Sequence, residues 1–130
     1  MPAPLVTTYA LATMITCGDA ILADIDGGAG VGKIKLRSEA DVLLAEILLN
    51  NPGGTVNVLT GILQLDPAGP DASADASGIA TYGEVTDSDD VVIMSIPVIE
   101  GATAVDGYLV LNIESIVAGS TVTILSAIIG

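Results

Sequence analysis

The sequence of 130 residues has the length of one domain, is 51% hydrophobic but only 15% charged, and carries 16 acidic against 3 basic side chains for a net charge of −13. With no His and a single Cys, it cannot form a Ser-His-Asp triad, a Cys-His pair, a Cys/His zinc site or an internal disulfide. Three cations neutralise few phosphates, which argues against a nucleic-acid ligand, and the apolar content argues against a disordered chain.

The N-terminal part of the chain predicts an arm over residues 1–7 and a helix over residues 8–26. The apolar positions of the helix are Leu11, Met14, Ile15, Leu22 and Ile25. Thr7-Thr8 can cap its start, and Gly27-Gly28 favours its end because glycine adopts left-handed backbone at low cost. Cys17 lies near the apolar stripe, so we expect it to be a small core residue.

After the glycines the apolar period changes from that of a helix to that of a strand, which predicts a β-domain over residues 33–130. Residues 33–37 alternate and predict a strand with Ile and Leu inward and the cations outward. Residues 42–49 are compatible with a buried strand or a short helix. The segment Asn50–Gly54 predicts a turn, and residues 56–65 predict a further strand.

The second half of the chain continues as short strands between turn signals. Residues 66–78 are rich in Pro, Ala, Ser and Asp and predict an exposed loop or arm. Residues 79–86 and 91–96 flank an acidic turn and predict a β-hairpin. Residues 108–113 and 121–129 predict the last strands. The sequence therefore predicts a single, mainly β domain: an antiparallel β-sandwich or partly closed barrel of about six or seven strands with one N-terminal α-helix.

A glycine-rich segment imitates a nucleotide-binding motif. Residues 27–33, Gly-Gly-Ala-Gly-Val-Gly-Lys, match the start of a phosphate-binding loop. Ile34 stands where the magnesium ligand belongs, and the segment follows a helix and precedes a strand, which is the reverse of the required order. We interpret it as a flexible connection and expect no nucleotide.

Acidic residues gather in the predicted hairpin turn. Asp87, Asp89 and Asp90 could share a cation with a loop acid such as Asp71 or Asp75, but turn propensity explains them equally well. Because the acids of the chain fall in turns, loops or outward strand positions, we expect no catalytic carboxylate pair. The prediction is a protein that is not an enzyme and has no catalytic residues, cofactor or metal site.

Two kinds of segment are candidates for partner contact. Lys33, Lys35 and Arg37 form the only positive stripe of an acidic protein. A solvated strand face explains the stripe, and a docking line for an acidic partner or sister subunit is the alternative. The further candidates are Leu5 and Val6 of the arm and Pro67 and Pro70 of the loop. They are chosen because their segments lack core-forming residues.

Three stretches, residues 1–18, 47–65 and 115–130, contain no charge. Thr, Asn, Gly or Pro interrupts each of them, so none forms a membrane-spanning run of about 18 apolar residues. The first lacks the basic residues of a signal peptide, so we expect it to belong to the mature protein. We predict no membrane partner, and an aliphatic excess that another protein covers.

Several segments in a fixed order carry a resemblance to a known family. They are residues 25–30, 32–36, 43–46, 73–78 and 115–122. Together they resemble, over nearly the whole chain, a family of small virion structural proteins of tailed bacteriophages. Where that family often has an aromatic or charged residue in the hairpin strand, this chain has Thr81-Tyr82-Gly83-Glu84.

The resemblance implies a non-enzymatic component on the exterior of a phage particle, made in the host cytoplasm. We expect a capsid decoration (cement) protein that bridges coat subunits, with the major capsid protein or other virion proteins as partners. We also expect a homo-oligomer, and favour a trimer. One alternative is a neck, tail or fibre-associated structural protein. Another is a module that binds a sugar or host surface through Tyr9, Tyr82 or Tyr108.

Overall fold

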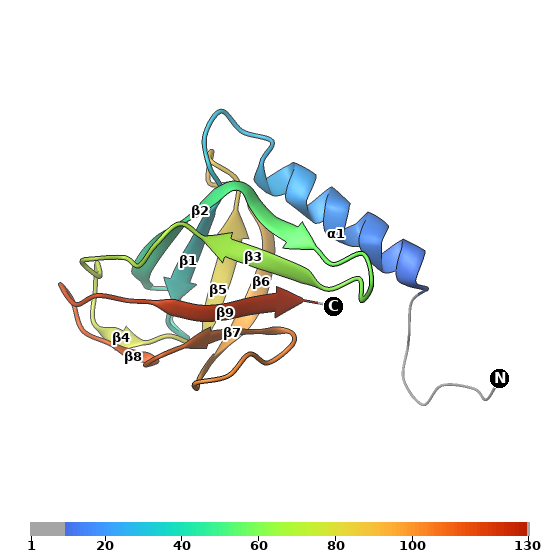
Figure 1. Ribbon diagram of the computed structural model, residues 1–130. Coiled ribbons are helices and arrows are strands. Elements are labelled where there is room, and N and C mark those ends of the chain that lie inside the picture. The colour runs from blue at the N-terminus through green and yellow to red at the C-terminus, as the bar shows by residue number, and fades with distance from the viewer. Residues whose placement is uncertain (1–9, 130) are drawn as a thin grey trace.

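A closed β-barrel of seven strands forms the body of the computed structural model, which describes residues 10–129 (Figure 1). Its elements are α1 (Leu11–Ile25), β1 (Lys33–Arg37), β2 (Leu43–Val56), β3 (Leu63–Pro67), β4 (Gly78–Ile79), β5 (Tyr82–Thr86), β6 (Val92–Glu100), β7 (Tyr108–Leu111), β8 (Ser115–Ile116) and β9 (Ile124–Ile129). The order around the barrel is β1-β2-β3-β9-β7-β6-β5, and β4 pairs with β8 in a small second sheet. The prediction of a mainly β fold with one N-terminal helix is confirmed.

Strand direction departs from the prediction at one pair. The neighbours in the barrel are antiparallel except β6 and β7, which run parallel with Val98 opposite Leu109. A hairpin turn would have made these two strands antiparallel. Instead the connection of residues 101–107 folds back beside the end of β6, so β7 starts in the same direction. The barrel is therefore mixed, and the purely antiparallel prediction is wrong.

The barrel interior is filled by side chains from alternate strand positions, as expected for a barrel of this size. In β1, Ile34 and Leu36 are fully buried and the three cations lie on the outer face, which confirms the predicted alternation. The predicted hairpin around the acidic turn is also confirmed, with β5 and β6 paired through Glu84 and Ser95. The other large, fully buried side chains of the core are Ile25, Leu44, Ile47, Leu49, Leu63, Val85, Leu109, Val110, Leu111 and Val122.

The predicted turn at Asn50–Gly54 does not reverse the chain. Strand β2 runs through it, with a shift in its register to β3 between Leu49 and Gly54. The two glycines serve close packing. A Cβ at Gly53 would lie 2.6 Å from Cγ2 of Ile25, and one at Gly54 would overlap the carbonyl oxygen of Gln64. The sequence signal of a turn here marks a bent strand pressed between the helix end and β3.

The reversal occurs later, within the segment predicted as one strand over residues 56–65. The Oδ1 atom of Asn57 accepts the N–H groups of Leu59 and Thr60 at 2.8 and 3.3 Å, which folds a tight turn. Gly61 completes it with a φ of 72°, where glycine is favoured. The predicted strand is therefore two strands, β2 and β3, joined by this turn.

Helix α1 lies against the barrel, and its last residue enters the core (Figure 1). Ile25 is fully buried, and the next residue, Asp26, accepts the N–H of Gly53 through Oδ1 at 3.0 Å. The buried face of the helix passes through Gly18, which leaves the neighbouring Cys17 exposed, so the prediction of a buried cysteine is wrong. The predicted arm (residues 1–7) and the Thr7-Thr8 cap lie outside the described residues.

Candidate functional site

The three cations of β1 are paired with carboxylates of this chain. Lys33 Nζ and Lys35 Nζ lie 3.0 and 2.9 Å from Oδ1 of Asp90, which belongs to the β5–β6 turn. Lys33 Nζ also lies 3.7 Å from Oε1 of Glu46 on β2.

The third cation, Arg37, is also bound by groups of this chain. Arg37 donates through Nε to Glu84 on β5 and through an NH group to the carbonyl oxygen of Asp41. Because β1 lies between β2 and β5, acids on both neighbours flank the stripe. The predicted docking line is thus already neutralised from within, and an acidic partner would have to displace these carboxylates.

These contacts shift two of the pKa values in opposite directions. The hydrogen bond to Asp90 raises the pKa of Lys33 above 10.5, and the nearby charges of Glu46 and Asp90 act the same way. Hydrogen bonds from Lys35 and then Lys33 lower the pKa of Asp90 below 3.8. Both shifts favour the charged forms, so the cluster fastens the β5–β6 turn to β1 at neutral pH.

We expect Asp90→Asn to lower the thermal midpoint slightly near neutral pH. Since the folded-state pKa of Asp90 lies below its unfolded value of 3.8, the stabilisation is present above that value and is lost as the pH falls through the folded pKa. Midpoints of wild type and variant, measured from pH 7 to pH 2 by circular dichroism, should therefore converge in acid. Added salt should also reduce the difference between the two thermal midpoints at pH 7.

The matched control is Asp89→Asn, which removes a neighbouring exposed carboxylate of the same turn. It should leave the midpoint near that of the wild type. A difference between Asp90→Asn and wild type that persists unchanged at pH 2 would contradict the role given to the ion pairs.

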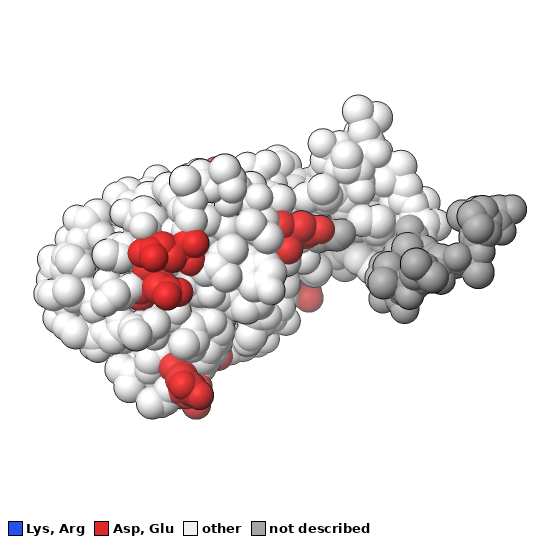
Figure 2. Space-filling view, turned by 90° about the horizontal axis from the view of Figure 1, so that it is seen from below, with Lys and Arg blue, Asp and Glu red and all other residues white. Residues whose placement is uncertain are grey.

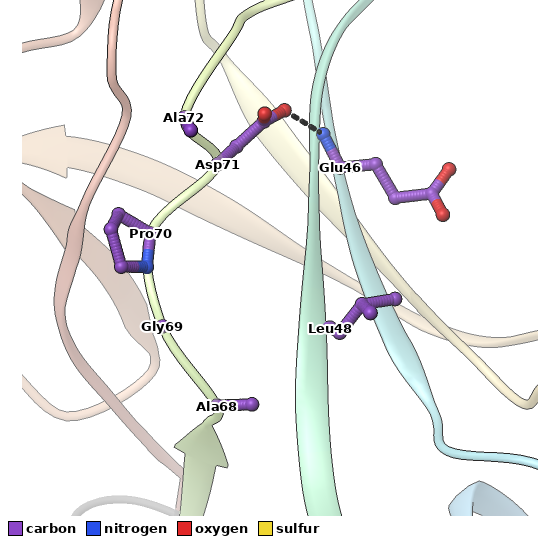
Figure 3. Close-up of a pocket in the computed structure, with 7 residues that line it drawn as sticks. All are labelled: Glu46, Leu48, Ala68, Gly69, Pro70, Asp71 and Ala72. Atoms are coloured by element: carbon purple, nitrogen blue, oxygen red, sulfur yellow. Dashed lines mark hydrogen bonds between the residues drawn. The ribbon is translucent and has the colours of Figure 1, made fainter.

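A hollow of about 350 Å³ lies between β2 and the segment that follows β3 (Figure 3). Its lining residues are Glu46, Leu48, Ala68, Gly69, Pro70, Asp71 and Ala72. The two carboxylates do not face each other: Asp71 Oδ2 accepts the backbone N–H of Glu46 at 3.0 Å, and the Glu46 side chain points away from Asp71 (Figure 3). With one carboxylate bound to backbone and the other near Lys33, the hollow holds no acid/base pair.

The predicted exposed loop, residues 66–78, is held on the end of the barrel. Most of its residues are exposed, including Pro70, while Pro67 is half-buried as the last residue of β3. Asp71 and Val122 exchange two backbone hydrogen bonds of 2.9 and 2.8 Å, and Ala74 is buried under the turn that contains Ser120. The segment is therefore a fastened loop, and the picture of a free arm is wrong.

Three of the five acids proposed for a cation are held by other contacts. Asp87 Oδ1 accepts the N–H groups of Asp89 and Val91 at 2.9 and 3.0 Å, and Asp90 binds the two lysines. Asp71 Oδ2 accepts the backbone N–H of Glu46 on β2. Within residues 10–129 no three His, Cys, Asp or Glu side chains come together as a metal site would require.

The glycine-rich segment, residues 27–33, connects α1 to β1 as predicted. Its concave side is filled, because a Cβ at Gly28 would overlap the hydroxyl of Ser88 and one at Gly32 would meet the carbonyl oxygen of Thr86 at 3.0 Å. The space that a phosphate would need is taken by the β5–β6 turn.

Exposed aliphatic side chains form the most distinctive surface of the described residues. Val58 and Leu59, at the β2–β3 turn, are 67% and 83% exposed. Ile79 on β4 and Val117, directly after β8, are 58% and 61% exposed. Sequence reasoning missed both places, since Val58 and Leu59 fall inside a predicted strand and Ile79 begins another.

The charges on the side of the barrel that carries Ile79 are acidic. The side of the barrel on which β4, β7 and β8 lie shows Asp and Glu side chains and no Lys or Arg (Figure 2). The tyrosines offer little for a sugar: the Tyr82 hydroxyl donates to Asp41, which raises the Tyr82 pKa above 10.0, and Tyr108 is 37% exposed. Tyr9, Leu5 and Val6 lie outside the described residues.

In the described part of the chain, no helix combines the length and the apolarity that crossing a membrane requires. Comparison with protein-family models, with curated proteins and with solved structures finds no match for this chain.

Proposed function

We propose that this chain is a non-enzymatic structural protein of a tailed-phage particle, and that it decorates the outside of the capsid. The observation that carries the proposal is the exposure of large aliphatic side chains on a small barrel whose three cations are already paired with its own carboxylates. Isolated apolar side chains are common on protein surfaces, but groups of them mark sites of protein contact.

The location of these side chains suits a cement role. Ile79 lies on β4 and Val117 directly follows β8, whereas Val58 and Leu59 lie on the turn between β2 and β3, which is a separate part of the surface. A protein with two separate contact surfaces can bind a coat subunit with one and another molecule with the other. Binding to the assembled coat in preference to free subunits stabilises the assembled state by mass action.

Nothing in the described geometry favours catalysis. The carboxylates that approach one another, those of the β1 cluster, are held in ion pairs with lysine or arginine, and Asp71 is bound to backbone. The proposed partners are the major capsid protein or other virion proteins, and the proposed location is the exterior of the particle.

The test is the number of copies per purified particle of the phage that encodes the chain, measured by mass spectrometry against the major capsid protein. A ratio near one to one, or a fixed large fraction of it, supports decoration of the head. A count of about a dozen or fewer would overturn decoration in favour of a neck or tail ring. Absence from the particles would overturn the structural role altogether.

A further inference from the structure

The fold brings together uncharged segments that are far apart in the sequence. The first half of α1, the β2–β3 hairpin and β9 contain no charged residue from residue 10 to 18, from 47 to 65 and from 124 to 129. Gly18 of α1 lies against Val56 of β2, and β3 pairs with β9 through Gln64 and Ile128. These segments lie side by side along one side of the barrel (Figure 1).

A row of neutral side chains crosses this side. Thr55 on β2 is opposite Gln64 on β3, Gln64 is opposite Ile128 on β9, and Ile128 is opposite Tyr108 on β7. Residues directly opposite each other on neighbouring strands point to the same side of a sheet. Thr55, Gln64 and Tyr108 are exposed and Ile128 is half-buried, so the row lies on the outside. We call this row, together with the turn of residues 57–62, the neutral face.

The neutral face has a projection and a hollow next to each other. The projection is Val58-Leu59, held by a turn in which Asn57 makes backbone hydrogen bonds of 2.9 Å to Ile62 and 2.7 Å to Gly61. The hollow, about 310 Å³ in volume, is lined by Thr55, Asn57, Thr60, Ile62 and Gln64. Because its walls are uncharged and partly apolar, an aliphatic side chain can enter without meeting a charge.

The charge of the whole chain points to the occupant. Two copies with a net charge of −13 repel one another wherever their acids approach within about the Debye length, roughly 8 Å at physiological salt. The neutral face is where that repulsion is least, with Asp66 and Asp106 only at its edges. A basic partner would instead be attracted to the acidic surface seen in Figure 2.

We propose that copies of this chain associate through the neutral face, with Leu59 of one copy inserted into the hollow of the other. Because the projection and the hollow lie side by side in one turn, a two-fold contact lets each copy insert Leu59 into the hollow of the other, and the expected assembly is a dimer. The inference rests on the proposed function for its biological use, because a dimer places two coat-binding surfaces on one object. Its test in solution does not depend on a particle.

The first experiment compares molar masses of the full chain by light scattering after size-exclusion chromatography. The wild type should run as a dimer, and Leu59→Asp should lower the mass about twofold. Ile79→Asp is the control, since it makes the same change at a 58% exposed site on β4 and should keep the oligomer. A monomeric wild type, or equal masses for wild type and Leu59→Asp, overturns the proposal.

A second experiment keeps the proposal testable if Leu59→Asp does not fold. In a Cys17→Ser background, one sample of Leu59→Cys and one of Gln64→Cys are mixed and oxidised with oxidised glutathione. Insertion of residue 59 into the hollow should give a mixed disulfide, since bonding requires the Cα atoms to approach within about 7 Å. Ile79→Cys mixed with Gln64→Cys should give none. Absence of the 59–64 species between folded chains overturns the inserted geometry.

The two proposals fail separately. A chain that is monomeric in solution but abundant in particles overturns the neutral-face contact and leaves the decoration role standing. A dimer that depends on Leu59 in solution, with the chain missing from particles, supports the neutral-face contact and overturns the decoration role.

Discussion

Replacing Leu109 with Ala is expected to lower the free energy of unfolding by about 2–5 kcal/mol, the range for removing a large aliphatic side chain from a core. Leu109 is fully buried in β7, and inside the barrel its Cδ1 reaches past β6 to the backbone of Gly83 on β5. The side chains around Gly83 are Ile34 and Leu36 of β1, so the space left by Leu109 would lie at the centre of the barrel. Urea denaturation followed by circular dichroism measures the change.

The converse substitution, Gly83→Ala, should also destabilise the barrel, by about 1–3 kcal/mol, because the new methyl group would overlap Leu109 Cδ1. Combined with Leu109→Ala, the same methyl group would occupy part of the vacated space. The double variant should therefore lose less stability than the sum of the single losses, and a double-mutant cycle measures the difference. Additive losses would show that these two residues do not meet in the barrel interior.

Ile25→Ala is expected to be comparably damaging, with a loss of about 2–5 kcal/mol, although the residue belongs to the helix and not to a strand. Ile25 is fully buried. Its Cγ2 fills space that a side chain at position 32 or 53 would need, and both of these residues are glycine. Removing it would open the end of the barrel on which the helix ends. The same denaturation measurement applies, with the helical signal followed separately.

The control for Ile25→Ala is Leu11→Ala at the other end of the same helix. Leu11 is 43% exposed, so its loss should change stability by at most about 0.5 kcal/mol, as for surface positions in general. If the two variants lose equal stability, then Ile25 does not anchor the helix to the barrel.

Periodicity was sufficient to predict the fold class. The alternation of residues 33–37 identifies a strand with two buried side chains, and the acidic turn between β5 and β6 identifies a hairpin. The helical stripe identifies the buried end at Ile25 but misassigns Cys17, because a glycine at the contact, Gly18, carries no apolar signal.

What the sequence could not predict depends on contacts between distant segments. Glycines at 53 and 54 resemble a turn, and only the approach of Ile25 and Gln64 shows that they permit close packing. The parallel pairing of β6 with β7 is set by the path of the connection between them, for which local composition gives no signal. A strand that ran in the opposite direction would show the same alternation of buried and exposed residues.

The candidate surfaces were harder to predict for a related reason. Val58 and Leu59 have the β-propensity of strand residues, and it is the Asn57 turn that places them outside. The positive stripe of β1 was predicted correctly as outward, but its neutralisation depends on the register of β1 with β2 and β5. The register pairs residues that lie far apart in the sequence. The sequence of β1 alone therefore shows three cations without their acidic partners.

The position of β9 in the barrel has a consequence for synthesis on the ribosome. β9 is the last strand of the chain, yet it lies between β3 and β7 and pairs with both. The barrel therefore cannot close while translation proceeds from Pro67, where β3 ends, to Ile129, where β9 ends. During that interval nascent β3 has one edge without its partner, and unpaired edges favour pairing with other chains. Nascent chains on neighbouring ribosomes of one messenger therefore expose the same unpaired β3 edge to one another.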